Sequence, residues 1–254
     1  MSSPTYYLDL IVHFVRCDFS LRYKGSVLGI LWSLMLPIAQ LLVLVFLFQR
    51  VIPLKIDDYP AFVFSALLPW SWFSNCMSAS GNLFISNRNL MWRPRFAPVT
   101  LVIVNTLSNL FLFLVQMPIL AGVMFFYGRD MTFSLLFVPL LILIQGILLV
   151  GFGMILATLN VFYRDVQHIV SVALMLLFYL TPVFYWSENV GENYRILYLL
   201  NPIAVLIQSY RAVFFYGTVP EWHSLLLLSG ASVAICGLGY LIYSRQLHKV
   251  IDTI

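Results

Sequence analysis

The side chains that could carry chemistry are few in this chain, and they are widely spaced. Its four histidines are His13, His168, His223 and His248, and its three cysteines form no CxxC pair. There is no HExxH, GxSxG or GxxxxGK[ST] motif and no pair of carboxylates suited to acid–base work. The sequence therefore predicts no metal site, no catalytic residue and no P-loop for ATP in this chain.

One short polar stretch, LNVFYRDVQHIV, interrupts the apolar sequence at residues 159–170. It places Tyr163, Arg164, Asp165 and His168 between two long apolar runs. One interpretation is local: Asp165 accepts hydrogen bonds from the first amides of the next helix and favours its positive end. The other is that this turn is a surface on which a second protein pushes.

The composition is that of a membrane protein. Hydrophobic residues make up 61% of the 254 residues and charged residues only 9%, whereas soluble domains contain about 25% charged residues. A lipid-exposed backbone must satisfy its own hydrogen bonds, so we predict an all-α integral membrane protein. The N-terminus does not resemble a removable signal peptide. Six runs are long enough to span a bilayer: Val27–Gln49, Ala61–Ile85, Val99–Tyr127, Phe133–Leu159, Ile169–Trp186 and Leu225–Tyr243.

Six spans place both termini on one side, and the basic residues indicate which side. The face with the termini carries nine: Arg16, Arg22, Lys24, Arg88, Arg93, Arg95, Arg164, Arg245 and Lys249. The opposite face carries five: Arg50, Lys55, Arg129, Arg195 and Arg211. Cytoplasmic loops are enriched in Lys and Arg, so both termini are predicted to be cytoplasmic.

Residues 6–24 form an amphipathic segment that is too polar to span. A polar stripe containing Asp9, His13 and Arg16 lies on one side, which is typical of a helix in the membrane interface. Asp18 and Arg22 project from the other side. They either form a local ion pair or contact a protein beneath the membrane.

Two other connections are unusual. Residues 86–98 carry Arg88, Arg93 and Arg95. These arginines either set the topology and contact lipid headgroups, or they form a docking element for a cytoplasmic partner. Residues 193–216 contain two apolar runs, each too short to span, on either side of Asn201–Pro202. This pattern predicts a pair of re-entrant helices that turn at Asn201–Pro202 and are covered by protein or line a cavity.

The predicted spans hold almost no ionisable residues, which argues against an ion-coupled carrier. They are rich in aromatic residues instead, and these either form an interface belt or line a pathway for ring-shaped polar molecules such as sugars. The candidates for the pathway are Trp32, Trp70, Trp72, Phe73, Tyr179, Phe184 and Tyr185.

Several stretches together resemble the permease subunits of ABC-type polysaccharide exporters, the Wzm-like proteins and their teichoic-acid and capsule-exporting relatives. These are LRYKGSVLGILWSLMLP (21–37), PWSWFSN (69–75), LNVFYRDVQHI (159–169), YLTPVFY (179–185) and NPI (201–203). They lie in the family's order along nearly the whole chain. The resemblance is specific for the family and much less so for the glycan.

The resemblance implies a single transmembrane domain in a bacterial inner membrane. It implies a homodimer with two separate ATPase subunits, which bind ATP and Mg²⁺, and a lipid-linked, O-antigen-like polysaccharide as substrate. Membrane lipids are expected partners, and nucleic acid is not. The family's interface helix, two coupling elements and re-entrant pair match residues 6–24, 86–98, 160–168 and 193–216. A membrane-embedded enzyme that acts on lipid-linked sugars is the rival in another class, but no set of catalytic residues supports it.

The predicted coupling residues follow from this match. Tyr163, Arg164, Asp165 and His168 are expected to contact the ATPase. The arginines of residues 86–98 are expected to join them, and Asp18 and Arg22 are further candidates.

Overall fold

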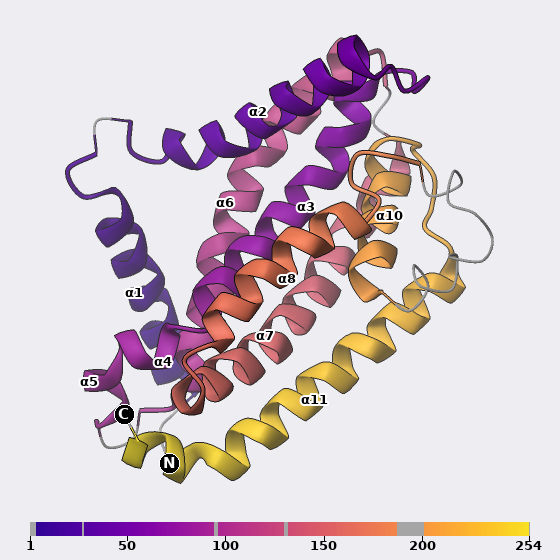
Figure 1. Ribbon diagram of the computed structural model, residues 1–254. Coiled ribbons are helices and arrows are strands. Elements are labelled where there is room, and N and C mark those ends of the chain that lie inside the picture. Colours follow the sequence, from indigo (N-terminus) through magenta and orange to yellow (C-terminus); the bar gives the residue numbers. More distant parts are fainter. Residues whose placement is uncertain (1–3, 27, 94–95, 130–131, 187–200, 254) are drawn as a thin grey trace.

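The computed structural model describes residues 4–26, 28–93, 96–129, 132–186 and 201–253, and every regular element in these ranges is a helix (Figure 1). The all-α prediction is therefore confirmed for this part of the chain. Four helical stretches within it are long and apolar enough to cross a membrane. They are α2 (Leu31–Phe46) with the π-helical η1 (Leu47–Val51), α6 (Val99–Phe126), η2 (Phe133–Phe137) with α7 (Val138–Phe162), and α11 (Trp222–Thr253).

The centre of the bundle is α3 (Tyr59–Ser80), which packs against α6 and α7 (Figure 1). Every residue from Ala61 to Trp70 is buried, because this half of the helix has large apolar side chains on all sides. The predicted span Ala61–Ile85 is thus a central helix that ends at Ser80. The short helices α4 (Leu83–Ser86) and α5 (Arg88–Met91) follow it.

Helices α7 and α11 approach each other closely through glycines. A Cβ atom built on Gly151 would lie 2.6 Å from the backbone nitrogen of Cys236, and one built on Gly239 would meet the carbonyl oxygen of Gly151. Small residues let two membrane helices approach until their backbones touch. At 32 residues, α11 is about 48 Å long, more than the ~30 Å hydrocarbon core of a bilayer.

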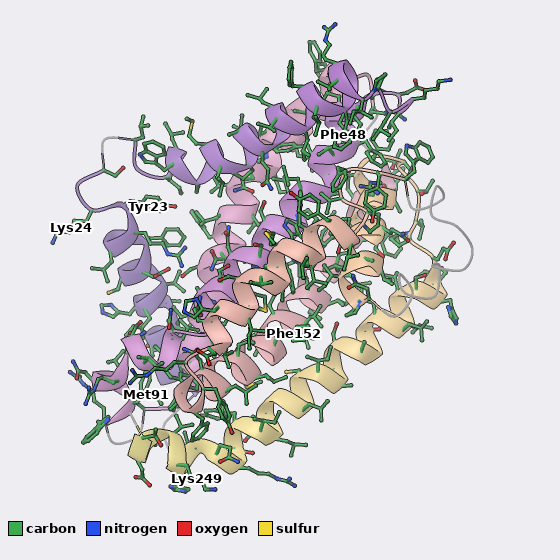
Figure 2. The ribbon with its side chains drawn as sticks, viewed as in Figure 1. Tyr23, Lys24, Phe48, Met91, Phe152 and Lys249 are labelled. Atoms are coloured by element: carbon green, nitrogen blue, oxygen red, sulfur yellow. The ribbon has the colours of Figure 1, made fainter. Side chains whose placement is uncertain are left out.

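The two ends of the bundle differ in what they contain. The chain termini, α4, α5 and the turn between α7 and α8 (Val166–Leu180) lie at one end (Figure 1). Met91 and Lys249 mark this end and Phe48 the opposite one (Figure 2). Near the termini, Tyr243 and Val250 of α11 are buried with Phe84 and Met91. At the other end α10 (Pro202–Phe214) closes the bundle (Figure 1).

Helix α8 is shorter than its predicted span Ile169–Trp186. It has 15 residues, about 22 Å, and stops at Leu180 because Thr181 precedes a proline and adopts an extended conformation. Only Val170 and Leu174 of this helix are buried. The part of the predicted re-entrant pair that precedes Asn201 lies outside the described residues.

The amphipathic segment predicted at residues 6–24 is helix α1 (Pro4–Tyr23). Its polar stripe, which includes Asp9, His13 and Arg16, is exposed, and its aromatic side faces α6, where the Phe19 and Phe111 ring centres are 4.8 Å apart. Gly25, with a φ of +78°, forms the corner between α1 and the segment that leads to α2. Such a positive φ favours glycine.

Candidate functional site

A groove of about 1050 Å³ lies between α1, α2, α3 and α6. Its hydroxyl and amide side chains are Ser33, Gln40, Ser71, Ser74, Asn75, Ser78, Asn109 and Gln116. Those of α3 recur every three to four residues and so form one face of the helix. Tyr23 also lines the groove, whereas the neighbouring Lys24 points away from the bundle (Figure 2).

Amide side chains form a network behind the groove. Asn105 Nδ2 donates to the Cys76 carbonyl (3.1 Å), and Asn109 Nδ2 donates to Asn105 Oδ1 (3.0 Å). Asn109 Oδ1 accepts from Arg22 Nη1 at 3.4 Å. Polar groups at membrane depth are satisfied by one another in this way, which fixes the wall formed by α3 and α6.

The predicted local ion pair between Asp18 and Arg22 is present, with 2.9 Å between Oδ2 and Nε. Each side chain is about one-third exposed. Arg22 also lines the groove, with its charge paired to Asp18. Its contact with a protein beneath the membrane stays a prediction.

The predicted aromatic pathway residues separate into three groups. Trp32 and Trp70 line the groove. Trp72 and Phe73 are buried, and Trp72 Nε1 donates to the Thr106 carbonyl at 3.2 Å, so these two residues pack inside the bundle. Unlike the equally buried Trp70, neither of them lines the groove.

The third group gathers at the α10 end, away from the groove lining. Tyr179 is 61% exposed, the ring of Phe184 stacks on Phe48 at 5.3 Å, and the Tyr185 hydroxyl donates to the Leu180 carbonyl at 3.1 Å. Phe184 therefore packs the segment after α8 against the bundle, whereas Tyr179 stays exposed.

The predicted coupling residues lie together at the end with the termini. Tyr163, Arg164, Asp165 and His168 are all exposed in the turn that opens α8. The two predicted coupling loops are brought to one place, since Arg88 and Arg164 line a single cavity of about 480 Å³, which Asn82, Asn160 and Thr253 complete. Arg93 is exposed nearby on the chain, and Arg95 lies outside the described residues.

The prediction that the Asp165 side chain caps α8 is wrong. Asp165 occupies the N-cap position, but its carboxylate accepts no hydrogen bond from the first amides. Asn160, in the last turn of α7, takes this role instead: its Oδ1 accepts from the Gln167 backbone nitrogen at 3.2 Å. The short turn folds the end of α7 under the start of α8, which leaves Asp165 in the solvent.

Gln167 is a residue that the sequence analysis missed. Its Nε2 donates to the Ser78 carbonyl at 2.8 Å, near the C-terminus of α3. A Cβ on Gly81 would meet Gln167 Oε1, so the glycine makes room for this side chain. The turn before α8 is thus joined to the helix that carries the polar wall of the groove.

The opposite end contains a second missed residue, Arg211. It is only 3% exposed on α10, its Nη2 donates to the carbonyls of Pro182 and Val183 (both 2.8 Å), and its guanidinium lies 3.8 Å from the Phe62 ring centre. The sequence analysis used Arg211 only to count basic residues on the face opposite the termini. An ionisable residue within an apolar segment is the signal that could have identified it.

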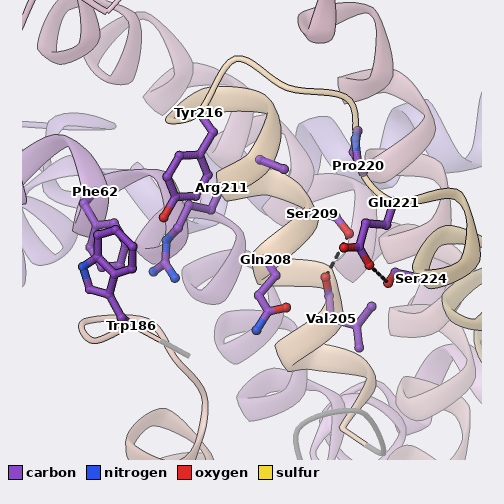
Figure 3. A pocket seen from close by; sticks show the side chains of 11 residues that line it. Phe62, Trp186, Val205, Gln208, Ser209, Arg211, Tyr216, Pro220, Glu221 and Ser224 are labelled. Carbon is purple, nitrogen blue, oxygen red and sulfur yellow. Dashed lines mark hydrogen bonds between the residues drawn. The ribbon is translucent and has the colours of Figure 1, made fainter. Parts of the chain in front are cut away.

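Arg211 lines a cavity of about 280 Å³ with Trp186, Gln208, Glu221 and Ser224, where Glu221 accepts from Ser224 at 3.2 Å (Figure 3). The predicted turn residues stand at the base of this helix. Asn201 caps α10, since its Oδ1 accepts from the Ile203 nitrogen at 3.0 Å, and Pro202 is the first helical residue.

No group of three or more His, Cys, Asp or Glu side chains that could hold a metal occurs in the described ranges.

Comparison with known proteins gives consistent matches. The profile of a family described as "ABC-2 type transporter" matches residues 10–215. The chain is 33% identical over 235 residues to the O-antigen export system permease protein RfbA of Klebsiella pneumoniae, covering 92% of this chain and 91% of the relative. RfbA of Myxococcus xanthus is 33% identical over 250 residues, 98% and 96% of the two chains. The polysialic acid transport protein KpsM of Escherichia coli is 22% identical over 231 residues, 89% and 88% of the two chains.

Proposed function

From the premise that this chain belongs to the ABC-2 type transporter family as a membrane permease subunit, we propose that it forms the channel of an ATP-driven exporter for a lipid-linked, O-antigen-like polysaccharide. The relatives that are 33% identical over nearly their whole length are O-antigen export permeases. ATP and Mg²⁺ bind to a separate ATPase subunit, and this chain itself performs no catalysis.

The observation that carries the substrate class is the polar face of the groove. A pyranose has a hydroxyl rim and an apolar C–H face, and the groove offers both kinds of partner. Ser74 and Asn75 present hydroxyl and amide groups, while Trp32 presents an exposed ring beside the more buried Trp70. Neutral hydrogen-bonding groups suit a polymer that must slide, because they bind each sugar unit weakly.

The proposed topology has six spans: α2–η1, α3, α6, η2–α7, α8 and α11. At 22 residues, α3 is about 33 Å long and reaches across the bilayer core, and its neighbours shield it from lipid. Helix α1 lies in the cytoplasmic interface, and α10 belongs to a re-entrant pair at the outer face. Both termini are cytoplasmic, in a bacterial inner membrane.

Two apolar helices support a homodimer. Along α2 only Pro37 and Leu44 are buried, and Leu36, Leu42 and Val43 are each more than 60% exposed. On α8, Ile169, Tyr179 and Leu180 are exposed to a similar degree. A second copy that covers these faces would close the open groove into a channel.

The proposed mechanism couples the ATPase to this channel at the end with the termini. The turn of Tyr163, Arg164 and Asp165 and the arginines of residues 86–98 contact the ATPase pair, with Asp18 and Arg22 close to the groove. Closure of the ATPases on ATP displaces the turn, and the two states differ in these contacts, as any such shift requires.

The test is a strain that lacks this chain, complemented with variants. We expect this strain to lose its surface polysaccharide and to accumulate the lipid-linked polymer in the cytoplasm. The wild-type gene should reverse both defects. Asn75→Leu, which turns one polar group of the groove apolar, should impair export, whereas Ser65→Ala, inside the bundle, should not. Normal surface polysaccharide in the strain without the chain would refute the proposal.

A capsule-type polysaccharide is the second candidate, favoured by the match to the polysialic acid transport protein KpsM. The identity is lower, 22% against 33%. The chemical class of the accumulated polymer distinguishes the two.

A further inference from the structure

An apolar cavity of about 410 Å³, separate from the groove, opens between α6, α7 and α10. Leu114, Met117, Ala121 and Met124 of α6 form one wall, and Val138 belongs to the opposite one. From Leu114 to Met124 the helix rises about 15 Å. This equals the hydrocarbon depth of one leaflet, since the full core is about 30 Å thick.

The surroundings of this cavity are those of a lipid-facing surface. Phe125, Phe126, Phe133 and Leu136, which flank it in the sequence, are between 81% and 98% exposed. Apolar cavities of this kind do not hold water, and one of about 150 Å³ accommodates a benzene molecule. The benzene cavity provides ~25 Å³ for each carbon atom. At that volume per carbon, a cavity of 410 Å³ holds an acyl segment of about 16 carbons.

A charge pair stands at the end of the cavity near α10. Arg129 lines the cavity and lies over the Phe215 ring, 4.4 Å from its centre. Its Nε and Nη2 bind Oδ2 of Asp58 at 2.9 and 2.7 Å, and each side chain is about one-third exposed. Within the described residues these bonds leave the donors of Arg129 Nη1 and the acceptor Oδ1 of Asp58 for a ligand.

We propose that this cavity binds a phospholipid with a zwitterionic headgroup from the leaflet at the α10 end. One acyl chain fills the apolar cavity along α6. The headgroup phosphate pairs with the Arg129 guanidinium, and the headgroup ammonium group pairs with the Asp58 carboxylate. Both contacts therefore join opposite charges. The bound lipid holds α6, α7 and α10 together at the end where α10 closes the bundle.

The test measures lipid retained by the purified full-length protein, using native mass spectrometry after addition of phosphatidylethanolamine or phosphatidylglycerol. We expect phosphatidylethanolamine to be retained about tenfold better, the effect of one charge-assisted hydrogen bond. Asp58→Asn removes the partner of the ammonium group and should abolish this preference.

Two neighbouring positions on α6 provide a matched pair. Ala121→Phe fills the cavity and should lower retention of both phospholipids about tenfold. Gly122→Phe adds the same ring where a Cβ meets nothing within 4 Å, and should retain lipid like the wild type. Equal retention of the two phospholipids by the wild type would overturn the proposal, as would unchanged retention by Ala121→Phe. Recovery of a polyprenyl lipid from the cavity would overturn it too. None of these measurements depends on export.

Discussion

Replacing Gln167 with alanine should disconnect the coupling turn from the groove. Helix α3 ends at Ser80, so the carbonyl of Ser78 is among the last four of the helix, which have no partner within it. Gln167 Nε2 supplies that partner at 2.8 Å. This bond is exposed, and one such hydrogen bond contributes about 0.5–1.5 kcal/mol. Gln167 Oε1 is itself buried without a partner in the described structure, and its removal offsets part of this cost. We therefore expect a net loss of about 0.5–1 kcal/mol, which changes the equilibrium between the joined and the separated turn and helix by a factor of about 2–5.

The assay compares ATP hydrolysis and export in the same preparation of permease and ATPase, reconstituted in vesicles with the lipid-linked polysaccharide. The Gln167→Ala complex should assemble and hydrolyse ATP, because the exposed surface of Tyr163, Arg164 and Asp165 is unchanged. Polysaccharide exported per ATP should fall. A defect confined to folding would instead lower the amount of complex and leave this ratio unchanged.

Two further variants sharpen the Gln167 test. Ser171→Ala, one turn along α8, removes only a bond to the carbonyl of its own helix at 3.0 Å and should keep the wild-type ratio. Gly81→Ala places a Cβ against the amide oxygen of Gln167 and should reproduce the Gln167→Ala defect. Wild-type export per ATP in the Gln167→Ala complex would refute the reasoning.

Three other predictions follow from single contacts. Arg164→Ala should uncouple ATP hydrolysis from export while the ATPase still co-purifies, and normal export would remove its coupling role. Gly151→Leu should lower the temperature of thermal inactivation in detergent, since overpacking against the Cys236 backbone costs about 1–3 kcal/mol; Gly146→Leu, where a Cβ meets nothing within 4 Å, should not. Arg211→Lys should destabilise the protein in the same assay, because an ammonium group cannot replace the planar guanidinium between two carbonyls and the Phe62 ring. An unchanged inactivation temperature in either of the last two would contradict the packing argument.

The sequence predicted those features that depend on local pattern. The amphipathic helix α1, the cap at Asn201 with Pro202 behind it, and the exposed turn at Tyr163–Asp165 each follow from residues close together in the chain. The long apolar helices also follow from local composition. In each case hydrogen bonds within the segment, or the partition of side chains between water and lipid, determine the structure.

The sequence could not predict features that depend on a distant partner. Whether Asp165 or Asn160 caps α8 depends on how α7 turns beneath it, and the reach of Gln167 to Ser78 depends on the space at Gly81. The burial of Arg211 depends on the carbonyls of Pro182 and Val183, which precede it by nearly thirty residues. Trp70 and Trp72 are two residues apart and both buried, yet only Trp70 lines the groove, because Trp72 bonds to α6 and Trp70 packs against Phe178 of α8.

Helix α3 explains why these distant contacts matter together. It carries the serine and asparagine face of the groove, and it is held at both ends by residues of the segment from Val166 to Phe184. Near Ser80 the tie is the Gln167 bond to Ser78, and at the other end the hydroxyl of Tyr59 donates to the Phe184 carbonyl at 3.1 Å. A displacement of the turn before α8 is therefore transmitted to the groove wall through these two hydrogen bonds, one at each end of α3. On the proposed function, the loosely packed α8 moves with the ATPase, and α3 transmits that movement to the face that contacts the sugar.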